Sequence, residues 1–138
     1  MSRAIGLKGR DKHIARLRKL QAVTRIAGAV VYEGADMVYQ EAFRLVGTGS
    51  ARGKRHVVSL PGQPPNREEG HLQNNMKTVR TGPLTAEFRS EAEYAGALEF
   101  GTSKMAARPH VRPARDTMEP RIRKRFVDNM NKLVKRSG

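Results

Sequence analysis

The sequence predicts an α+β fold, because two long helical patterns flank a short stretch with the alternation of a β-hairpin. Apolar residues recur three or four positions apart over residues 11–47 and again near the C-terminus, and they alternate with polar residues around position 86. The first spacing is typical of amphipathic helices and the second of half-buried strands. With 138 residues the chain is long enough for one modest core, so we expect a single domain, 1–138.

The N-terminal part predicts a long helix over residues 11–47, preceded by a flexible arm over residues 1–10. No proline interrupts the helical pattern, and Gly47 is placed to end it. Such a helix is roughly 55 Å long at about 1.5 Å per residue, whereas a domain of this size has a radius of gyration of about 14 Å. Either one end projects, or the ends fray around a central core helix. Gly28 and Gly34 indicate either a bend or a close helix contact.

The middle of the chain predicts an extended loop followed by small elements. Residues 48–70 are rich in Gly, Ser and Pro, and a connection this long is usually functional or disordered, so we expect an exposed arm. Residues 71–111 form the expected region of a short helix and a β-hairpin. Its elements are a helical turn at 71–76, hairpin arms at 77–80 and 84–90 around Thr81, Gly82 and Pro83, and an apolar run at 94–100 that is either a strand or a helical turn.

The C-terminal part predicts a basic helix over residues 112–138, with Pro113 or Pro120 in its first turn. Its apolar stripe consists of Ile122, Phe126, Val127, Met130, Leu133 and Val134. Lysines and arginines occupy most of the remaining positions, and cations near a helix C-terminus also stabilise the helix dipole. The candidate contacts to phosphates or to an acidic partner are Arg121, Arg123, Lys124 and Arg125.

The formal charge of +14 is concentrated at the two ends. Residues 1–20 carry +6 and residues 108–138 carry +7, which leaves +1 for residues 21–107. Such ends neutralise phosphates, meet an acidic protein surface, or simply keep the protein soluble. The basic segments have almost no aromatic side chains for base stacking and no known nucleic-acid-binding motif, so any DNA contact is expected to be sequence-independent.

The sequence predicts no enzyme, no metal site and no cofactor. It has no cysteine and no phosphate-binding loop, and its four histidines stand in different elements with no i, i+4 pair. Glu68 and Glu69 are adjacent in a loop and point apart, which is unsuitable for an acid–base pair. Without an apolar leader or a run of ~20 apolar residues, we also expect no signal peptide and no membrane partner.

Four segments, taken in order, carry a recognisable pattern. Residues 59–65 read Ser-Leu-Pro-Gly-Gln-Pro-Pro and residues 70–72 read Gly-His-Leu. A Tyr-Ala pair and Glu-Phe-Gly-Thr follow within residues 94–102, and residues 108–114 read Arg-Pro-His-Val-Arg-Pro-Ala. The chain thereby resembles the tail-completion family of long-tailed, lambda-like bacteriophages, also described as head–tail joining or minor tail proteins. His110 stands where the family pattern has Phe, and Glu69 and Gln73 stand where it has Thr and Arg.

The resemblance assigns two groups of site residues. Loop residues expected to contact partners in assembly are Pro61, Gly62, Pro64, Pro65, Gly70 and Leu72. Residues of the family motif with an expected structural role are Tyr94, Glu99, Phe100, Gly101, Arg108, Pro109, Arg112 and Pro113. For Glu99 we expect that it accepts hydrogen bonds or an ion pair that fixes its turn, and for Gly101 a positive φ. His110 in place of Phe suggests a more polar pocket beneath the last helix.

The resemblance also implies an architecture and a function. It implies an α+β domain in which both long helices pack with a small antiparallel sheet, and a ring, sixfold by analogy with tail symmetry, at the junction of head and tail. The implied partners are further copies of the chain, tail terminator and tail-tube proteins, head connector or stopper proteins, and packaged DNA through non-specific contact. The implied location is the neck of the virion, with host cytoplasm during assembly. The alternative from charge alone is a small, basic, sequence-independent nucleic-acid-binding protein.

Overall fold

The computed structural model describes residues 8–47, 59–65 and 70–137. Along the chain these residues form α1 (Arg10–Gly47), α2 (His71–Asn74), β1 (Met76–Gly82), β2 (Thr85–Ser90), α3 (Ala95–Phe100) and α4 (Val111–Ser137). The α+β class predicted from the sequence is confirmed. Most of the arm expected at 1–10 and of the loop expected at 48–70 lies outside the described residues. The single-domain organisation stays a prediction.

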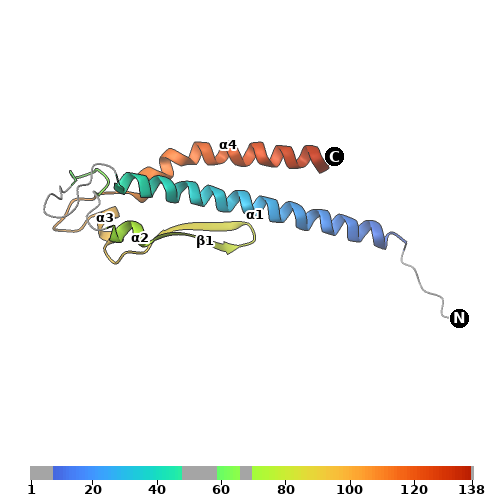
Figure 1. Cartoon of the computed structure of the whole chain (residues 1–138), viewed down its shortest axis with the longest axis horizontal. Helices are drawn as coiled ribbons and strands as arrows, with labels where there is room; N and C mark the ends of the chain where they lie inside the picture. Colours follow the sequence, from blue (N-terminus) through green and yellow to red (C-terminus); the bar gives the residue numbers. More distant parts are fainter. Residues whose placement is uncertain (1–7, 48–58, 66–69, 138) are drawn as a thin grey trace.

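Helix α1 is the central element, with the hairpin along one side and α4 along the other (Figure 1). β1 and β2 pair antiparallel with Thr78 opposite Phe88, and the register shifts between Arg80 and Gly82. Phe88 lies on the side of the hairpin that faces α1, where its ring centroid is 6.3 Å from that of Tyr39. The alternation predicted for the second arm of the hairpin therefore orients Phe88 toward the helix.

The hydrophobic core is small and lies at the C-terminal end of α1. Four of its seven buried members are alanines, and the full set is Ala42, Val46, Leu72, Met76, Ala92, Ala95 and Ala114. Alanine buries little area, so this core contributes less hydrophobic free energy than one built of leucine and phenylalanine. A chain with only 38% apolar residues has few larger side chains to place there.

Two glycines of α1 allow neighbouring elements to approach closely. A Cβ at Gly28 would collide with the carbonyl oxygen of Pro83 at the tip of the hairpin, and a Cβ at Gly34 would lie 2.9 Å from Cγ2 of Ile122 in α4. Of the two roles that the sequence left open, close contact is the one observed. These glycines set how near the hairpin and α4 come to α1.

The structure also decides the other open alternatives. Residues 94–100 contribute the helix α3 rather than a strand. Helix α4 begins at Val111, so Pro113 lies in its first turn and Pro120 in its interior. The N-terminal end of α1 projects beyond the hairpin and beyond α4 (Figure 1). No helix in the described part of the chain is long and apolar enough to cross a membrane.

Candidate assembly site

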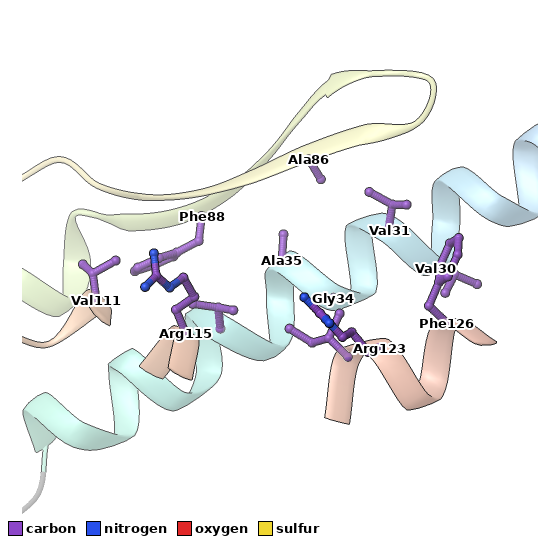
Figure 2. Close-up of a pocket in the computed structure, with 12 residues that line it drawn as sticks. Val30, Val31, Gly34, Ala35, Ala86, Phe88, Val111, Arg115, Arg123 and Phe126 are labelled. Atoms are coloured by element: carbon purple, nitrogen blue, oxygen red, sulfur yellow. The ribbon is translucent and has the colours of Figure 1, made fainter. Parts of the chain in front are cut away.

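An apolar groove of ≈ 460 Å³ lies where α1, β2 and α4 meet (Figure 2). Side chains spaced three or four apart on α1 form its floor, alternate residues of β2 form one wall, and α4 forms the other. The lining residues are Val30, Val31, Gly34, Ala35, Val38, Ala86, Phe88, Val111, Arg115, Ile122, Arg123 and Phe126. A solvent-open apolar surface with a polar edge is typical of a site that another molecule covers.

The close packing of α4 on α1 gives the groove its shape. Gly34 lets Ile122 approach the helix backbone. One turn away, Arg125 forms an ion pair with Glu33, with 2.5 Å between Nη2 and Oε1. These contacts fix α4 against α1 on one side, while the hairpin stays on the other, so a gap remains between Phe88 and α4.

The arginines at the edge of the groove form ion pairs with carboxylates of the same helix. Arg115 contacts Asp116 at 3.1 Å, and Arg123 contacts Glu119 at 2.8 Å. All four side chains are largely exposed, so these pairs contribute little to stability. An apolar floor with arginines at its edge is a composition enriched in protein interfaces.

Glu99 anchors the start of α4. Its carboxylate accepts hydrogen bonds from the backbone N–H groups of His110, Val111 and Arg112, at 2.9, 3.0 and 2.8 Å. Burial raises the pKa of Glu99, but the three backbone donors together with His110 outweigh it, so the pKa lies below its usual value. These N–H groups have no partner inside the helix, and a carboxylate at a helix N-terminus also stabilises the dipole. Of the two interactions expected for Glu99, hydrogen bonds are present, and their donors lie at the start of α4.

His110 is fully buried between the end of β2 and Glu99. Its Nε2 lies 3.0 Å from Ser90 Oγ, and its Nδ1 lies 3.4 Å from Glu99 Oε2 without a hydrogen-bond partner among the described residues. Burial lowers the pKa of the imidazole, and the attraction of Glu99 opposes only part of that effect. The ring is therefore neutral at pH 7, and its contact with Glu99 is not an ion pair. The polar neighbours of His110 at the start of the last helix are Ser90 and Glu99.

The other motif residues divide into buried connections and exposed positions. Gly101 has φ +75°, and a Cβ there would meet the backbone of Ala107 at 2.9 Å, so glycine is required. Arg108 donates from Nε to the carbonyl oxygen of Ser59 at 3.1 Å, which ties the loop to α3 and α4. Pro109 and Pro113 are half-buried. Tyr94 and Phe100, in contrast, are exposed.

The expected loop contacts lie in two environments. Pro61 and Gly62 are exposed; Gly62 has φ +82° and donates its N–H to the carbonyl oxygen of Ala107 at 2.8 Å. Pro64 is half-buried. Pro65, Gly70 and Leu72 are buried, and Leu72 belongs to the core. In this conformation Pro61 and Gly62 are the members of the set that a partner can reach.

The four basic residues singled out in α4 do not act as one free patch. Arg125 is paired with Glu33 of α1, and Arg123 with Glu119 of its own helix. Arg121 lies close enough to Glu41 to contribute to lowering the pKa of that carboxyl, after the larger effect of the hydrogen bond from Arg44. Lys124 is exposed. Three of the four therefore interact with carboxylates of the chain itself.

The groove was not predicted from the sequence. Its signal was the pair of glycines in α1, because a close contact at Gly34 implies that a second element packs there. In the described ranges no three His, Cys, Asp or Glu side chains gather in a way that would hold a metal ion. The arrangement offers surfaces for binding another molecule.

A family model described as "Bacteriophage HK97-gp10, putative tail-component" matches residues 11–101, which is 91 of the 138 residues. The matched region runs from the start of α1 to the end of α3 and stops before α4. Neither a search of curated proteins nor a search of solved structures found a match.

Proposed function

The chain belongs to the HK97-gp10 family of bacteriophage tail components, and we propose that it is a tail-completion subunit at the junction of head and tail. As a member of this family it is a structural protein of the phage tail. The finer position is our proposal: copies form a ring between the head connector and the tail tube, around the DNA channel. Its neighbours there are tail terminator and tail-tube proteins on one side and head connector or stopper proteins on the other.

The observation that supports a ring is the presence of two unlike apolar surfaces on one chain. The first is the groove between α1, β2 and α4. The second is Phe100, which is 83% exposed at the end of α3. Subunits of a ring associate head to tail, and such association uses two different surfaces of each copy. We assign Phe100 as the group that one copy inserts into the groove of the next.

Phe100 is held by a well-anchored segment. Glu99 before it accepts three backbone hydrogen bonds from α4, and Gly101 after it makes a turn that a side chain would not permit. Leu98 also accepts a backbone hydrogen bond from Arg108 at 2.6 Å. An aromatic side chain on a preorganised segment loses little conformational freedom when it binds. This is why an exposed Phe here suits an interface.

The groove suits an aromatic side chain in composition. Its floor is aliphatic, and Arg115 and Arg123 stand at its edge. A buried aromatic ring contributes 150–250 Å² of contact area, and arginine at the edge adds a favourable interaction with the ring face. Aromatic side chains in such pockets dominate the binding energy of many interfaces.

Mixing two variants tests the head-to-tail contact. Phe100→Glu removes the inserted group, and Ala35→Trp fills the groove into which Ala35 points (Figure 2). By native mass spectrometry, each variant alone is expected to stay monomeric at concentrations where the unmodified protein forms rings. The mixture retains one intact pair of surfaces and is expected to form heterodimers. Val134→Glu changes an apolar residue of α4 that is 68% exposed, against 83% for Phe100, and serves as the control that still forms rings.

In infected cells, neither Phe100→Glu nor Ala35→Trp is expected to rescue a phage that lacks this gene, and heads and tails should accumulate unjoined. Rescue by both variants, or rings formed by either variant alone, would overturn the proposal. Cryo-electron microscopy of intact particles locates the subunit; a position away from the neck would contradict the tail-completion role.

The charge-based alternative, sequence-independent nucleic-acid binding, makes a different prediction. Filter binding to duplex DNA measures it, because phosphate contacts weaken steeply with salt. Binding that is lost by about 200 mM salt agrees with a structural subunit. Tight binding that persists there, together with normal head–tail joining by Phe100→Glu, favours the alternative.

A further inference from the structure

We infer that residues 10–26, the projecting part of α1, form a docking site for an acidic amphipathic helix of a partner protein. This inference deepens the proposed function and rests on it only in taking the neighbour to be another protein of the particle. It concerns a different surface from the groove and Phe100, so the two can be tested separately.

The first observation is that the described chain leaves most of this part of α1 uncovered. Every residue from 10 to 22 is exposed, and Ala27 is the first buried residue that the helix reaches. The hairpin ends at the level of Gly28, where Pro83 contacts the helix. Figure 1 shows the blue end of α1 extending past both the hairpin and the C-terminus of α4. A helix that leaves its own fold needs a partner to bury its apolar side.

The second observation is a row of exposed aliphatic side chains on this segment. Ile14, Leu17 and Leu20 follow one another three positions apart and are 37, 45 and 57% exposed. This spacing places them on neighbouring turns of one side of the helix. A partner helix packs such a row through its own apolar residues at positions three and four apart.

The third observation is a shallow pocket of ≈ 420 Å³ where this row meets the tip of the hairpin. It is lined by Leu17, Leu20, Gln21, Thr24, Arg25, Arg80 and Pro83. The row and the pocket are continuous because Leu17 and Leu20 belong to both. The pocket therefore extends the apolar row as far as the tip of the hairpin.

The fourth observation is the charge on either side of the row. Residues 10–26 carry six Lys or Arg and one Asp, and the pocket adds Arg80. The single carboxylate, Asp11, already contacts Arg10 at 3.4 Å. Arg16, Arg18 and Lys19 have no carboxylate partner among the described residues. The occupant that complements this surface carries acidic groups beside its apolar residues.

The same charges argue against the other occupants. A second copy that docks through its α4 or through the same cationic segment sets like charges facing each other across the interface, which is unfavourable. Duplex DNA satisfies the cations but leaves the aliphatic row without an apolar partner, because phosphates and sugars line its surface. An acidic amphipathic helix satisfies both.

Peptide binding to the full-length protein tests the inference. The probes are synthetic helices of equal length: one with Leu on one side and Glu on the other, one with Lys in place of Glu, and one with Ala in place of Leu. By fluorescence anisotropy, only the Leu–Glu helix is expected to bind, and its affinity should fall with added salt. The variant Leu17→Ser/Leu20→Ser removes two apolar side chains from the row. It is expected to bind the Leu–Glu helix at least about tenfold more weakly.

A matched control separates this site from general attraction to a basic protein. Val127→Ser/Val134→Ser removes two exposed apolar residues of α4, 52 and 68% exposed, and should bind the Leu–Glu helix like the unmodified protein. The inference would be overturned if the Lys helix bound as tightly as the Leu–Glu helix, or if both double variants weakened binding equally. It would also be overturned if duplex DNA displaced the helix while Leu17→Ser/Leu20→Ser had no effect on binding. Oligomers of the protein that Leu17→Ser/Leu20→Ser alone abolishes would also overturn it, since they would show that a second copy of the chain occupies this site.

Helix binding and ring formation use different surfaces, so separate variants should abolish each of them. Phe100→Glu, which is expected to prevent ring formation, should still bind the Leu–Glu helix. Leu17→Ser/Leu20→Ser should still form rings while losing the helix. A photoreactive amino acid at position 17 in assembled particles supplies the last measurement: a crosslink to an acidic segment of another tail protein supports the inference, and a crosslink to this same chain contradicts it.

Discussion

The two ends of α1 belong to one continuous helix and yet have opposite surroundings. Its C-terminal half lies between the hairpin and α4 and contributes Ala42 and Val46 to the core. Its N-terminal end projects past both elements, meets only the tip of the hairpin, and exposes Ile14, Leu17 and Leu20. Both halves show the same spacing of apolar residues. The comparison teaches that the apolar side of a helix predicts burial without saying whether the same chain or another protein provides the cover.

This difference has a consequence for stability. Packing of the covered half contributes to the free energy of unfolding of the whole domain, because removing a buried side chain there leaves a destabilising cavity. The projecting end, where residues 10–22 are all exposed, gains little from tertiary contacts in the isolated chain. Substitutions in the C-terminal half should therefore change the free energy of unfolding, whereas substitutions in the projecting end should change the affinity for a partner.

The largest expected effect is the contrast between a core leucine and a projecting leucine. Leu72→Ala is expected to lower the free energy of unfolding by about 2–5 kcal/mol, because Leu72 is buried in the core beside α1. Leu17→Ala should change it by less than about 0.5 kcal/mol. Urea unfolding followed by circular dichroism measures both. Similar losses in the two variants would mean that the projecting half is packed in the free protein.

A second prediction concerns the anchor of α4. Glu99→Gln is expected to cost about 1–3 kcal/mol, because an amide turns an N–H donor toward the backbone donors of α4 and removes the charge that favours the helix N-terminus. Glu93→Gln alters an exposed carboxyl nearby and is the control. Faster amide exchange at residues 110–112 in Glu99→Gln alone would confirm the role. Equal stability of the two variants would contradict it.

A third prediction tests the close contact between α1 and α4. Gly34→Val places side-chain atoms against Ile122 and is expected to cost about 1–3 kcal/mol through overpacking. Gly96→Ala in α3 meets nothing within 4 Å and should be neutral or slightly stabilising, since alanine favours helix. Thermal unfolding compares the two. A Gly34→Val protein as stable as Gly96→Ala would show that α4 does not pack closely here.

The smallest effect concerns pH. The pKa of His110 is lowered in the folded protein, so the unfolded chain binds the proton more tightly and stability falls as pH drops below about 6.5, the ordinary histidine value. Phe at this position, as in the family pattern, removes this group. Urea unfolding between pH 7 and 5 should therefore show a shallower loss for His110→Phe. If stability fell equally with pH in both proteins, groups other than His110 would be responsible for the pH dependence.

Much of the fold and one part of the site were predictable from local patterns. The period of three to four in α1, the stop at Gly47 and the alternation that orients Phe88 are properties of neighbouring residues. Hydrogen bonds to Glu99 were also expected, because a carboxylate within an apolar run needs hydrogen-bond partners, but the sequence did not identify the start of α4 as the donor. The groove was not predictable, since it is bounded by three elements that are far apart in the sequence.

The sequence by itself determined the two long helices, the position of the hairpin and the concentration of charge at the ends. These follow from side-chain periodicity and backbone preferences, which act over a few residues. Only the tertiary structure decided that Gly28 and Gly34 are contacts rather than bends, that residues 94–100 are helical, and that the N-terminal end of α1 projects past α4 and the hairpin. The physical reason is that periodicity defines the apolar side of an element, whereas its partner depends on the packing of the whole chain.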